Sequence, residues 1–312
     1  MTKQIYDIAI IGGGVTGLAS AMYAGRFNMK TLVIAGDLVG GTITLTDVVE
    51  NYPGFKRLTG LELADAIKKH ALEYKIDLKE ETLVNVERKK DLFYIKTNEN
   101  NEYSSKTVLF ATGTEFKKLD VKGEKEFTNK GVHYCAVCDG FIYNAKIVAV
   151  VGGGDSAAKE ALLLTQYTKK VYIIYRGEKI RPEPINMKRV EQNNKIEIIN
   201  KTNITEIVGE KVVKMVRLDK EHKGKKELSL DGVFVAIGHI PLSEHAKHLG
   251  VKTNDHNEII VDRDSKTNIS GVFAAGDVVN TKFKQAIVGA AEGVVAVYSA
   301  YTYINTKDFV MT

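Results

Sequence analysis

The chain has 312 residues, of which 44% are hydrophobic, and this length and composition predict a globular protein with two domains. Its 44 basic and 39 acidic residues give a formal net charge of +5 without any block of like charges, which argues against a nucleic-acid-binding protein. The N-terminal segment lacks the pattern of an export signal, so we expect a cytoplasmic protein.

The first elements form a βαβ unit. Residues 5–11 are a short apolar run typical of a buried strand, a glycine-rich turn follows, and residues 18–27 have the pattern of a helix. Residues 30–36 then predict a second strand. The acid that binds a ribose usually closes this strand, and Asp37 is the poor substitute found here.

The same order of elements returns in the middle of the chain. Residues 146–151 predict a strand, residues 158–168 a helix and residues 169–176 the next strand. Both units carry the G-x-G-x-x-G/A fingerprint of a dinucleotide-binding turn, whose small residues permit a tight turn and close approach of a pyrophosphate to the helix N-terminus. The matching residues are Gly12, Gly14 and Gly17 in the first turn and Gly152, Gly154 and Ala157 in the second.

Each unit is followed by an alternating apolar and polar pattern that predicts a β-hairpin, at residues 83–113 and 204–238. The second unit therefore reads as an insertion in the first. We expect an α/β fold with two Rossmann-like, three-layer (ββα) dinucleotide-binding domains. The first domain is discontinuous, at 1–115 and 244–312, and the inserted domain covers 116–243.

The strand after the second fingerprint ends at Tyr175-Arg176, without the carboxylate that would bind a ribose 2′-hydroxyl. Arg176 and Arg181 are candidates for binding a 2′-phosphate, which indicates NADPH. The alternative is that both are ordinary surface arginines, and Gly177 between them favours that alternative.

Cys135 and Cys138 have the Cys-x-x-Cys spacing of a redox-active disulfide, and Asp139 follows at once as a candidate for proton transfer. A structural zinc site needs four ligands, whereas the chain has no second cysteine pair and His133 is the one nearby histidine. We therefore expect no metal. Two buried, unreactive cysteines are the remaining alternative.

The last part of the chain predicts a strand at 271–275, a turn at Gly276-Asp277 and a helix that begins near Lys284. Asp277 is placed either to bind a polyol hydroxyl or simply to cap a helix. The N-terminus of the helix, with Gln285 and Ala286, suits the anionic N1–O2 edge of a reduced flavin.

The apolar segment 286–301 is interrupted by Gly289, Glu292 and Gly293, and it is shorter than the ~20 residues that span a bilayer. We therefore expect no membrane-spanning helix and no membrane partner.

Taken together, six motifs resemble the low-molecular-weight thioredoxin reductases, and the resemblance covers nearly the whole chain. They are GGGVTG at 12–17, ENYPG at 50–54, ATG at 111–113, CAVCDG at 135–140, GGGDSA at 152–157 and GVFAAGDV at 271–278.

The resemblance implies FAD in the outer domain, NADPH in the inserted domain, thioredoxin or a thioredoxin-like protein as partner, and a homodimer. It also implies that Cys138 faces the flavin, that Cys135 attacks the partner and that Asp139 handles a proton. The further residues it assigns to FAD are Gly41, Thr42, Asn51, Ala111, Thr112, Gly113, Gly276, Asp277, Lys284, Gln285 and Ala286. Those it assigns to NADPH are Asp155, Ser156, Ile237 and Gly238.

The chain departs from the family pattern at Gly177, where the phosphate-binding segment loses an arginine, at Thr42, where the family has glutamine, and at Lys284, where it has arginine. Three alternatives remain open, and the first departure favours the first two of them. These are an NADH-dependent reductase of a peroxiredoxin or glutaredoxin-like protein, a ferredoxin-dependent flavin thioredoxin reductase with a degenerate NADPH site, and a non-catalytic nucleotide-binding redox sensor. A thioredoxin reductase-like ferredoxin–NADP reductase is disfavoured, because proteins of that class lack the cysteine pair.

The disulfide and the nicotinamide are expected in one domain and the flavin in the other. We therefore hypothesise that the inserted domain rotates between two half-reactions, with hinges near 114–117 and 241–244.

Overall fold

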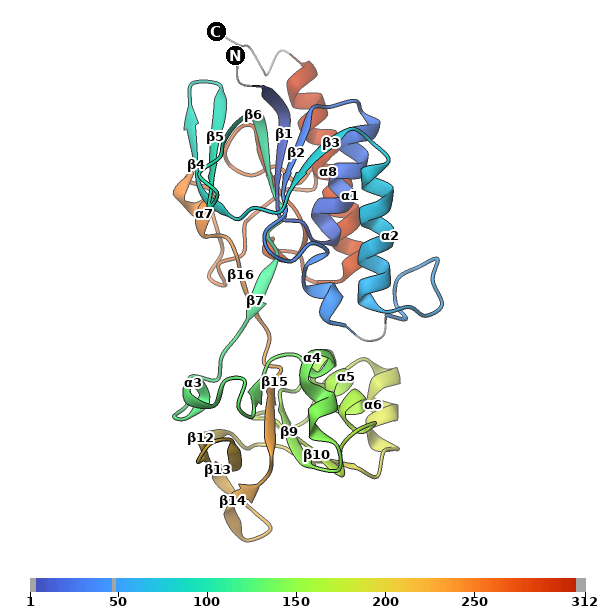
Figure 1. Ribbon diagram of the computed structural model, residues 1–312, viewed down its shortest axis with the longest axis vertical. Helices are drawn as coiled ribbons and strands as arrows, with labels where there is room; N and C mark the ends of the chain where they lie inside the picture. Colours follow the sequence, from blue (N-terminus) through green and yellow to red (C-terminus); the bar gives the residue numbers. More distant parts are fainter. Residues whose placement is uncertain (1–3, 47–48, 307–312) are drawn as a thin grey trace. The chain divides into compact units, whose positions relative to one another are not determined.

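The computed structural model describes residues 4–46 and 49–306. It divides into two compact units, which are described separately (Figure 1). The outer unit comprises Met1–Glu115 and Ile240–Thr312, and the inserted unit comprises Phe116–His239.

The chain passes from one unit to the other twice, and the two passages pair as strands β7 (Thr114–Phe116) and β16 (His239–Pro241). The return passage therefore lies at 239/240, earlier than the boundary that the sequence suggested at residue 244. The reason is that β16 already begins at His239, where it is held by β7.

The outer unit is built on a seven-stranded sheet with the order β3-β2-β1-β6-β5-β4, in which β17 also pairs with β6. Neighbouring strands are parallel among β1, β2, β3, β6 and β17, and antiparallel in the meander β4–β5–β6. The strands are β1 (Ile5–Ile11), β2 (Thr31–Ile34), β3 (Ile76–Lys79), β4 (Leu83–Lys89), β5 (Leu92–Thr97), β6 (Glu102–Phe110) and β17 (Val272–Ala274).

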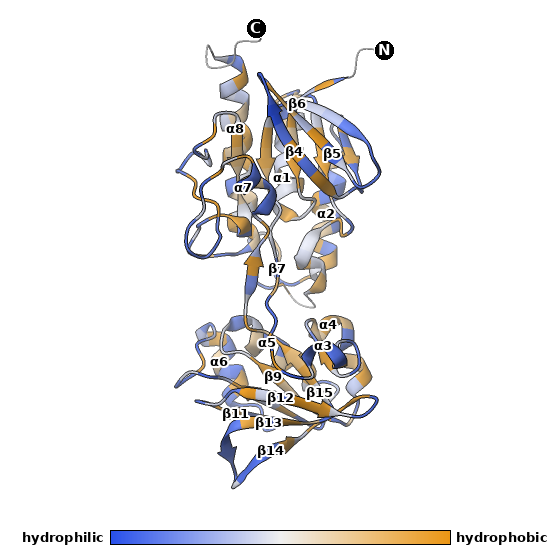
Figure 2. Cartoon of the chain, turned by 90° about the vertical axis from the view of Figure 1, so that its left-hand side faces the viewer, coloured by the Kyte–Doolittle hydropathy of each residue, from blue (hydrophilic) through white to orange (hydrophobic). Residues whose placement is uncertain are grey.

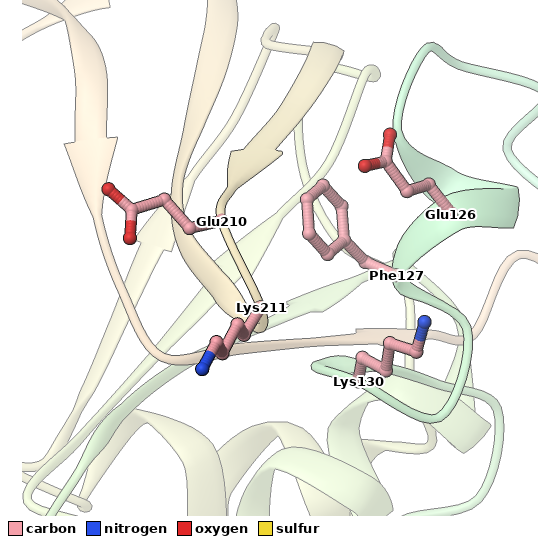
Figure 3. A pocket seen from close by; sticks show the side chains of 5 residues that line it. All are labelled: Glu126, Phe127, Lys130, Glu210 and Lys211. Carbon is pink, nitrogen blue, oxygen red and sulfur yellow. The ribbon is translucent and has the colours of Figure 1, made fainter.

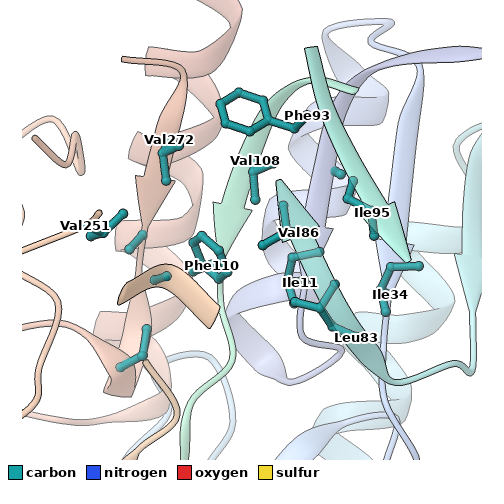
Figure 4. Packing of buried hydrophobic residues seen from close by; sticks show 14 of the residues in the cluster. Ile11, Ile34, Leu83, Val86, Phe93, Ile95, Val108, Phe110, Val251 and Val272 are labelled. Carbon is teal, nitrogen blue, oxygen red and sulfur yellow. The ribbon is translucent and has the colours of Figure 1, made fainter. Parts of the chain in front are cut away.

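The strands β2 and β17 and most of β1 are buried on both faces, as strands between two layers are, whereas the edge strand β3 is not. Successive residues of β1 enter different hydrophobic clusters. Ile11 packs with Val86 and Phe110 in the cluster beside the meander (Figure 4). Ile10 packs in the cluster on the side of the helices. Figure 1 shows α1, α2 and α8 grouped on that helical side. The helices are α1 (Val15–Arg26), α2 (Gly60–Leu72), α7 (Glu244–His248) and α8 (Ala286–Asn305), with the 3-10 turns η1 (Gly41–Leu45) and η3 (Gly276–Val278).

The inserted unit repeats this plan with a five-stranded parallel sheet, β11-β10-β9-β15-β8, and a three-stranded antiparallel meander, β12-β13-β14. Figure 2 shows hydrophobic residues along β9 and β15 and hydrophilic ones around β14. The strands are β8 (Val132–His133), β9 (Ile147–Val151), β10 (Lys170–Ile174), β11 (Ile196–Ile199), β12 (Ile204–Gly209), β13 (Val213–His222), β14 (Lys225–Ser229) and β15 (Gly232–Val235). The helices are α3 (Glu124–Phe127), α4 (Ala136–Asp139), η2 (Gly140–Tyr143), α5 (Asp155–Leu164) and α6 (Pro184–Glu191). The predicted α/β fold class is confirmed in both units.

Helix α8 runs from Ala286 to Asn305 and so continues past the apolar segment 286–301. By length and composition alone these 20 residues are sufficient to cross a membrane, so the expectation that the segment is too short was wrong. One face of α8 packs on α1 in the structure: a side chain added at Gly293 would lie 2.8 Å from the Thr16 carbonyl oxygen. The glycines that interrupt the apolar run therefore permit close packing of two helices.

Candidate active site

The two cysteines form a disulfide at the start of the short helix α4, with their Cα atoms 5.4 Å apart. The preceding strand β8 pairs with β15, which fixes the segment to the edge of the inserted unit's sheet. The amide of Cys138 lies 3.1 Å from the Cys135 sulfur. Cys138 is exposed and Cys135 is half-buried.

Asp139 lies next to a buried histidine. Its Oδ2 atom is 3.0 Å from Nδ1 of His133, whose side chain is 3% exposed, whereas the carboxylate itself is half-buried. On the other side of the imidazole, Nε2 is 2.8 Å from the Tyr143 hydroxyl. Burial, together with the charges of Asp139 and Asp231, raises the pKa of Tyr143 to about 12. A chain of three polar side chains thus runs from the redox motif into the core.

The second glycine turn leaves β9 and leads into α5. Gly152 has φ of 154°, and a side chain there would lie 2.2 Å from the Ala236 carbonyl oxygen, so the fold itself requires glycine. A Cβ at Gly154 would meet nothing within 4 Å, so packing does not require glycine at this N-cap. Gly154 has no side chain to cap the α5 amides, and the turn therefore fits the close approach of a pyrophosphate. Ala157 is buried behind it, as the fingerprint predicts.

Asp155, in the first turn of α5, is held by the inserted unit itself. Its carboxylate accepts hydrogen bonds from the Glu183 amide at 2.9 Å and the Asn186 side chain at 2.8 Å, and Lys159 lies 2.9 Å away. Burial acts to raise the pKa of Asp155, but the hydrogen bonds from Asn186, Lys159 and Glu183 together lower it. Asp155 therefore fixes α6 to α5, whereas its neighbour Ser156 is exposed.

The two predicted phosphate-binding arginines lie beyond the end of β10, and both are exposed. Arg181 donates a long hydrogen bond of 3.3 Å to the hydroxyl of Tyr175, whose ring covers Gly153 in the glycine turn. The amide of Arg181 also bonds to the Gly153 carbonyl oxygen, so the segment is fixed to the turn. Ile237 and Gly238 follow β15, at the same carboxyl end of the parallel sheet.

The first glycine turn, in the outer unit, leads from β1 into α1. Side chains at Gly12 and Gly17 would lie 2.1 Å and 1.9 Å from carbonyl oxygens of the turn region. The segment before η1 packs on this turn, since the Gly40 amide bonds to Gly13 and Gly41 lies beside Gly14. This brings predicted flavin residues from both segments together and leaves Thr42 exposed beside them. The N-cap Gly14 carries no capping side chain, which fits a diphosphate at this end of α1.

Residues far apart in the sequence meet at the N-terminus of α8. The Asn51 side-chain amide donates to the Gln285 side chain over 2.9 Å, and Gln285 is the N-cap residue before Ala286. Lys284 is directed elsewhere: its ammonium group bonds to the carbonyl oxygens of Asp277 and Val279 and lies 2.9 Å from Glu258. In this structure Lys284 therefore holds the loop before α8, while the exposed Asp277 side chain lies in η3.

The segment Ala111-Thr112-Gly113 follows β6 beside the first glycine turn. The Ala111 carbonyl oxygen is the atom that a side chain at Gly12 would strike. Thr112 donates a hydrogen bond of 2.7 Å to the Leu242 carbonyl oxygen, and Gly113 adopts φ of 66°.

Sequence reasoning assigned no role to Glu292 on α8, although its carboxylate accepts from the Gly276 amide at 2.9 Å and the Thr281 hydroxyl at 2.6 Å. It therefore holds the predicted flavin turn. The sequence signal for this role was a single acidic residue within an otherwise apolar helix. A surface pocket on the inserted unit contains none of the predicted residues; it is lined by Glu126, Phe127, Lys130, Glu210 and Lys211 (Figure 3).

Two dinucleotide-binding units and one accessible Cys-x-x-Cys disulfide define a nucleotide-dependent disulfide oxidoreductase. A family model described as pyridine nucleotide-disulphide oxidoreductase matches residues 6–293. The thioredoxin reductase of Bacillus subtilis (strain 168) is 36% identical over 305 residues, which cover 97% of this chain and 96% of the relative. The chain therefore belongs to the pyridine nucleotide-disulphide oxidoreductase family, among the low-molecular-weight thioredoxin reductases.

Solved structures agree with this assignment. The thioredoxin reductase of Lactococcus lactis, in a crystal structure described as the FR conformation, is 34% identical with a TM-score of 0.92 over 96% of this chain and 99% of that chain. A ferredoxin-flavin thioredoxin reductase from Clostridium acetobutylicum is also 34% identical, with a TM-score of 0.53 over 97% of this chain and 99% of that one. The protein is an enzyme, a flavoprotein disulfide reductase whose family uses FAD and a pyridine nucleotide.

Proposed function

We propose that the protein passes electrons from NADPH, through FAD and the Cys135–Cys138 disulfide, to thioredoxin or a thioredoxin-like protein. The observation that carries this proposal is the disulfide itself, in which neither residue is buried: Cys138 is exposed, and Cys135, which is expected to attack the partner, is half-buried. The side chains that follow it are apolar and exposed, Phe141 by 62% and Ile142 by 49%. Exposed apolar residues beside a reactive sulfur suit a protein substrate, which can bury them when it docks.

The assignment of NADPH is supported by Arg176 and Arg181, which extend from the carboxyl end of β10 beside the second glycine turn. A 2′-phosphate is bound well by guanidinium groups. Glu178, the acid between these arginines, lies 2.8 Å from Lys201. Its charge is therefore partly offset by a neighbouring lysine.

FAD, when bound, supplies the two-electron acceptor that links the nicotinamide to the disulfide. The outer unit would hold it with the first glycine turn, with Asn51 and Gln285, and with the N-terminus of α8. In the exchange with the partner, the reduced Cys135 and Cys138 thiols lose two electrons and two protons and reform their disulfide. The partner disulfide gains both and becomes two thiols.

One experiment tests both the electron donor to FAD and the role of Cys138 in passing electrons to thioredoxin. The purified protein, loaded with FAD, is mixed anaerobically with NADPH, NADH or reduced ferredoxin, and the flavin absorbance is followed before oxidised thioredoxin is added. We expect rapid bleaching by NADPH and turnover of thioredoxin. Cys138→Ser should still bleach but lose thioredoxin reduction, because the electrons have no thiol exit.

Bleaching by reduced ferredoxin and by neither nicotinamide would identify ferredoxin as the electron donor in place of NADPH. The Clostridium acetobutylicum structure is described as a ferredoxin-flavin thioredoxin reductase. Preference for NADH would overturn the roles of Arg176 and Arg181, whereas unchanged thioredoxin turnover by Cys138→Ser would overturn the role of the disulfide.

A further inference from the structure

The imidazole of His133 is fixed on every side within the inserted unit. It stacks on Phe234, with ring centroids 5.3 Å apart and an interplanar angle of 27°, and it meets the ring of Tyr143 edge-on at 5.5 Å. Tyr143 is itself seated over Gly232, where any side chain would lie 2.5 Å from the phenol ring. With 3% of its side chain exposed, His133 can point its two nitrogens only toward Asp139 and Tyr143.

Tyr143 determines which nitrogen carries the proton. Its hydroxyl has no hydrogen-bond partner other than Nε2 of His133 among the residues that the structure describes. Its raised pKa, about 12, keeps the hydroxyl protonated near neutral pH. A carboxylate can only accept, so the neutral tautomer that fits both neighbours carries its proton on Nδ1, which faces Asp139, and accepts from the Tyr143 hydroxyl at Nε2.

Nδ1 of His133 lies 3.0 Å from Oδ2 of Asp139, but the contact does not have the geometry of a hydrogen bond, and the buried Nδ1 has no other hydrogen-bond partner among the described residues. Asp139 is the mobile member, because its carboxylate is 35% exposed while the histidine is enclosed. Rotation of the Asp139 side chain is the movement that would turn this contact into a hydrogen bond. The enclosed imidazole therefore acts as the fixed point, and the carboxylate beside the cysteines is the group that it holds.

We propose that His133 is a positioning residue that holds the Asp139 carboxylate in place for dithiol–disulfide exchange at Cys135 and Cys138. The proposal rests on the disulfide reductase function proposed above. When a thiol attacks an external disulfide, its proton passes to the Asp139 carboxylate and later to water, while the sulfur–sulfur bond of the substrate breaks. Closure of the Cys135–Cys138 bond then releases the second thiol of the substrate.

Other charged groups approach this chain from a surface pocket that His133 and Tyr143 also line. Lys146 lies 5.7 Å from the Tyr143 ring centroid, and Asp231 contributes to the high pKa of Tyr143. Lys130 and Lys214 complete the charged lining of the pocket. Asp139 and Tyr143 are the two polar groups in contact with the imidazole. The exchange rate should therefore respond to the loss of either contact.

The test uses the full-length protein reduced with dithiothreitol, freed of excess reductant and mixed with 5,5′-dithiobis(2-nitrobenzoate), with the release of thionitrobenzoate as readout. This assay needs neither a nicotinamide donor nor thioredoxin, so it can succeed even if the proposed physiological reaction is wrong. His133→Phe fills the same space without a polar atom and should slow the exchange by about tenfold.

His133→Asn retains a donor on the Asp139 side and should recover most of the rate. Tyr143→Phe should cause a smaller loss, and it carries the test if His133→Phe does not fold. His222 offers a matched control in the same unit, because its Nε2 lies 2.9 Å from Glu197 and its ring packs edge-on against Tyr172. His222→Phe should leave the exchange rate unchanged.

A double-mutant cycle separates positioning from general stability. In an Asp139→Asn background the further change His133→Phe should have almost no effect on the exchange rate. An equal loss in both backgrounds, or no rescue by asparagine, would overturn the proposal.

Discussion

At the scale of single residues, the burial of Glu160 on α5 lowers the stability of the folded protein when its carboxyl group is ionised. Its Oε2 atom is buried and has no hydrogen-bond partner among residues 4–46 and 49–306, and burial raises the pKa of Glu160 to about 8. An acid whose pKa is higher in the folded state binds its proton more tightly there. The free energy of unfolding therefore falls as the pH rises from about 4.5 to about 8.

Glu160→Gln should remove this loss, because an amide cannot ionise. We expect the variant to be more stable than the parent protein by about 1 to 3 kcal/mol at about pH 9 and nearly equal at about pH 5. Urea unfolding at both pH values, followed by circular dichroism, measures the difference. Glu191→Gln, at an exposed position on α6, is the control and should change little at either pH. A Glu160→Gln effect of equal size at both pH values would show that packing, rather than ionisation, is responsible.

At the scale of elements, the sequence predicted best what is encoded locally. The two glycine turns, with the strand before and the helix after each, are recognisable from short patterns, and the structure contains both βαβ units. The helix α8 was less well predicted, because its small residues look like interruptions until α1 packs against them.

Contacts between distant residues were the part that the sequence could not reveal. Asn51 meets Gln285, and Glu292 meets the Gly276 amide, only after the sheet brings their segments together. His133 is close to Cys135 in sequence, but its contact with Tyr143 depends on β8 and η2 placing both rings against Phe234. Residue type and spacing carry no signal for such contacts, which arise from tertiary packing. The cofactor-binding residues named from the sequence stay predictions.

The second glycine turn separates what the fold requires from what a ligand requires. Gly152→Ala forces a side chain against the Ala236 carbonyl oxygen, in a backbone conformation that only glycine adopts easily, and should destabilise the protein by at least about 1 to 3 kcal/mol. Gly154→Ala meets no protein atom within 4 Å and should leave the melting temperature nearly unchanged. It should nevertheless weaken binding of the pyridine nucleotide by about tenfold or more, because its methyl group occupies the approach to the α5 amides.

Thermal unfolding and calorimetric titration with the nucleotide distinguish the two variants. Each serves as the other's control, since both add one methyl group to the same turn. Unaltered nucleotide affinity in Gly154→Ala would show that the ligand does not approach this helix, and a stable Gly152→Ala would contradict the packing argument.

At the scale of the whole molecule, the two units are joined by only two passages of backbone, which pair as β7 and β16. The disulfide and the predicted nicotinamide site belong to the inserted unit, and the predicted flavin site belongs to the outer one. One flavin must exchange electrons with both. A rotation about the paired passages would let the two partners take turns, which is the motion that we propose.

Fluorescence energy transfer between the units tests this motion. Glu99→Cys lies at the exposed turn between β5 and β6, and Lys226→Cys lies in the exposed strand β14, so the pair reports the distance between units. The native cysteines are protected from labelling while their disulfide is intact. We expect the transfer efficiency to change when the labelled, FAD-loaded protein is reduced with the donor that bleaches it. The pair Lys226→Cys and Glu191→Cys lies within the inserted unit and should not respond. Equal efficiencies in the oxidised and reduced protein, in a variant that still turns over thioredoxin, would exclude the rotation, because one arrangement would then have to serve both half-reactions.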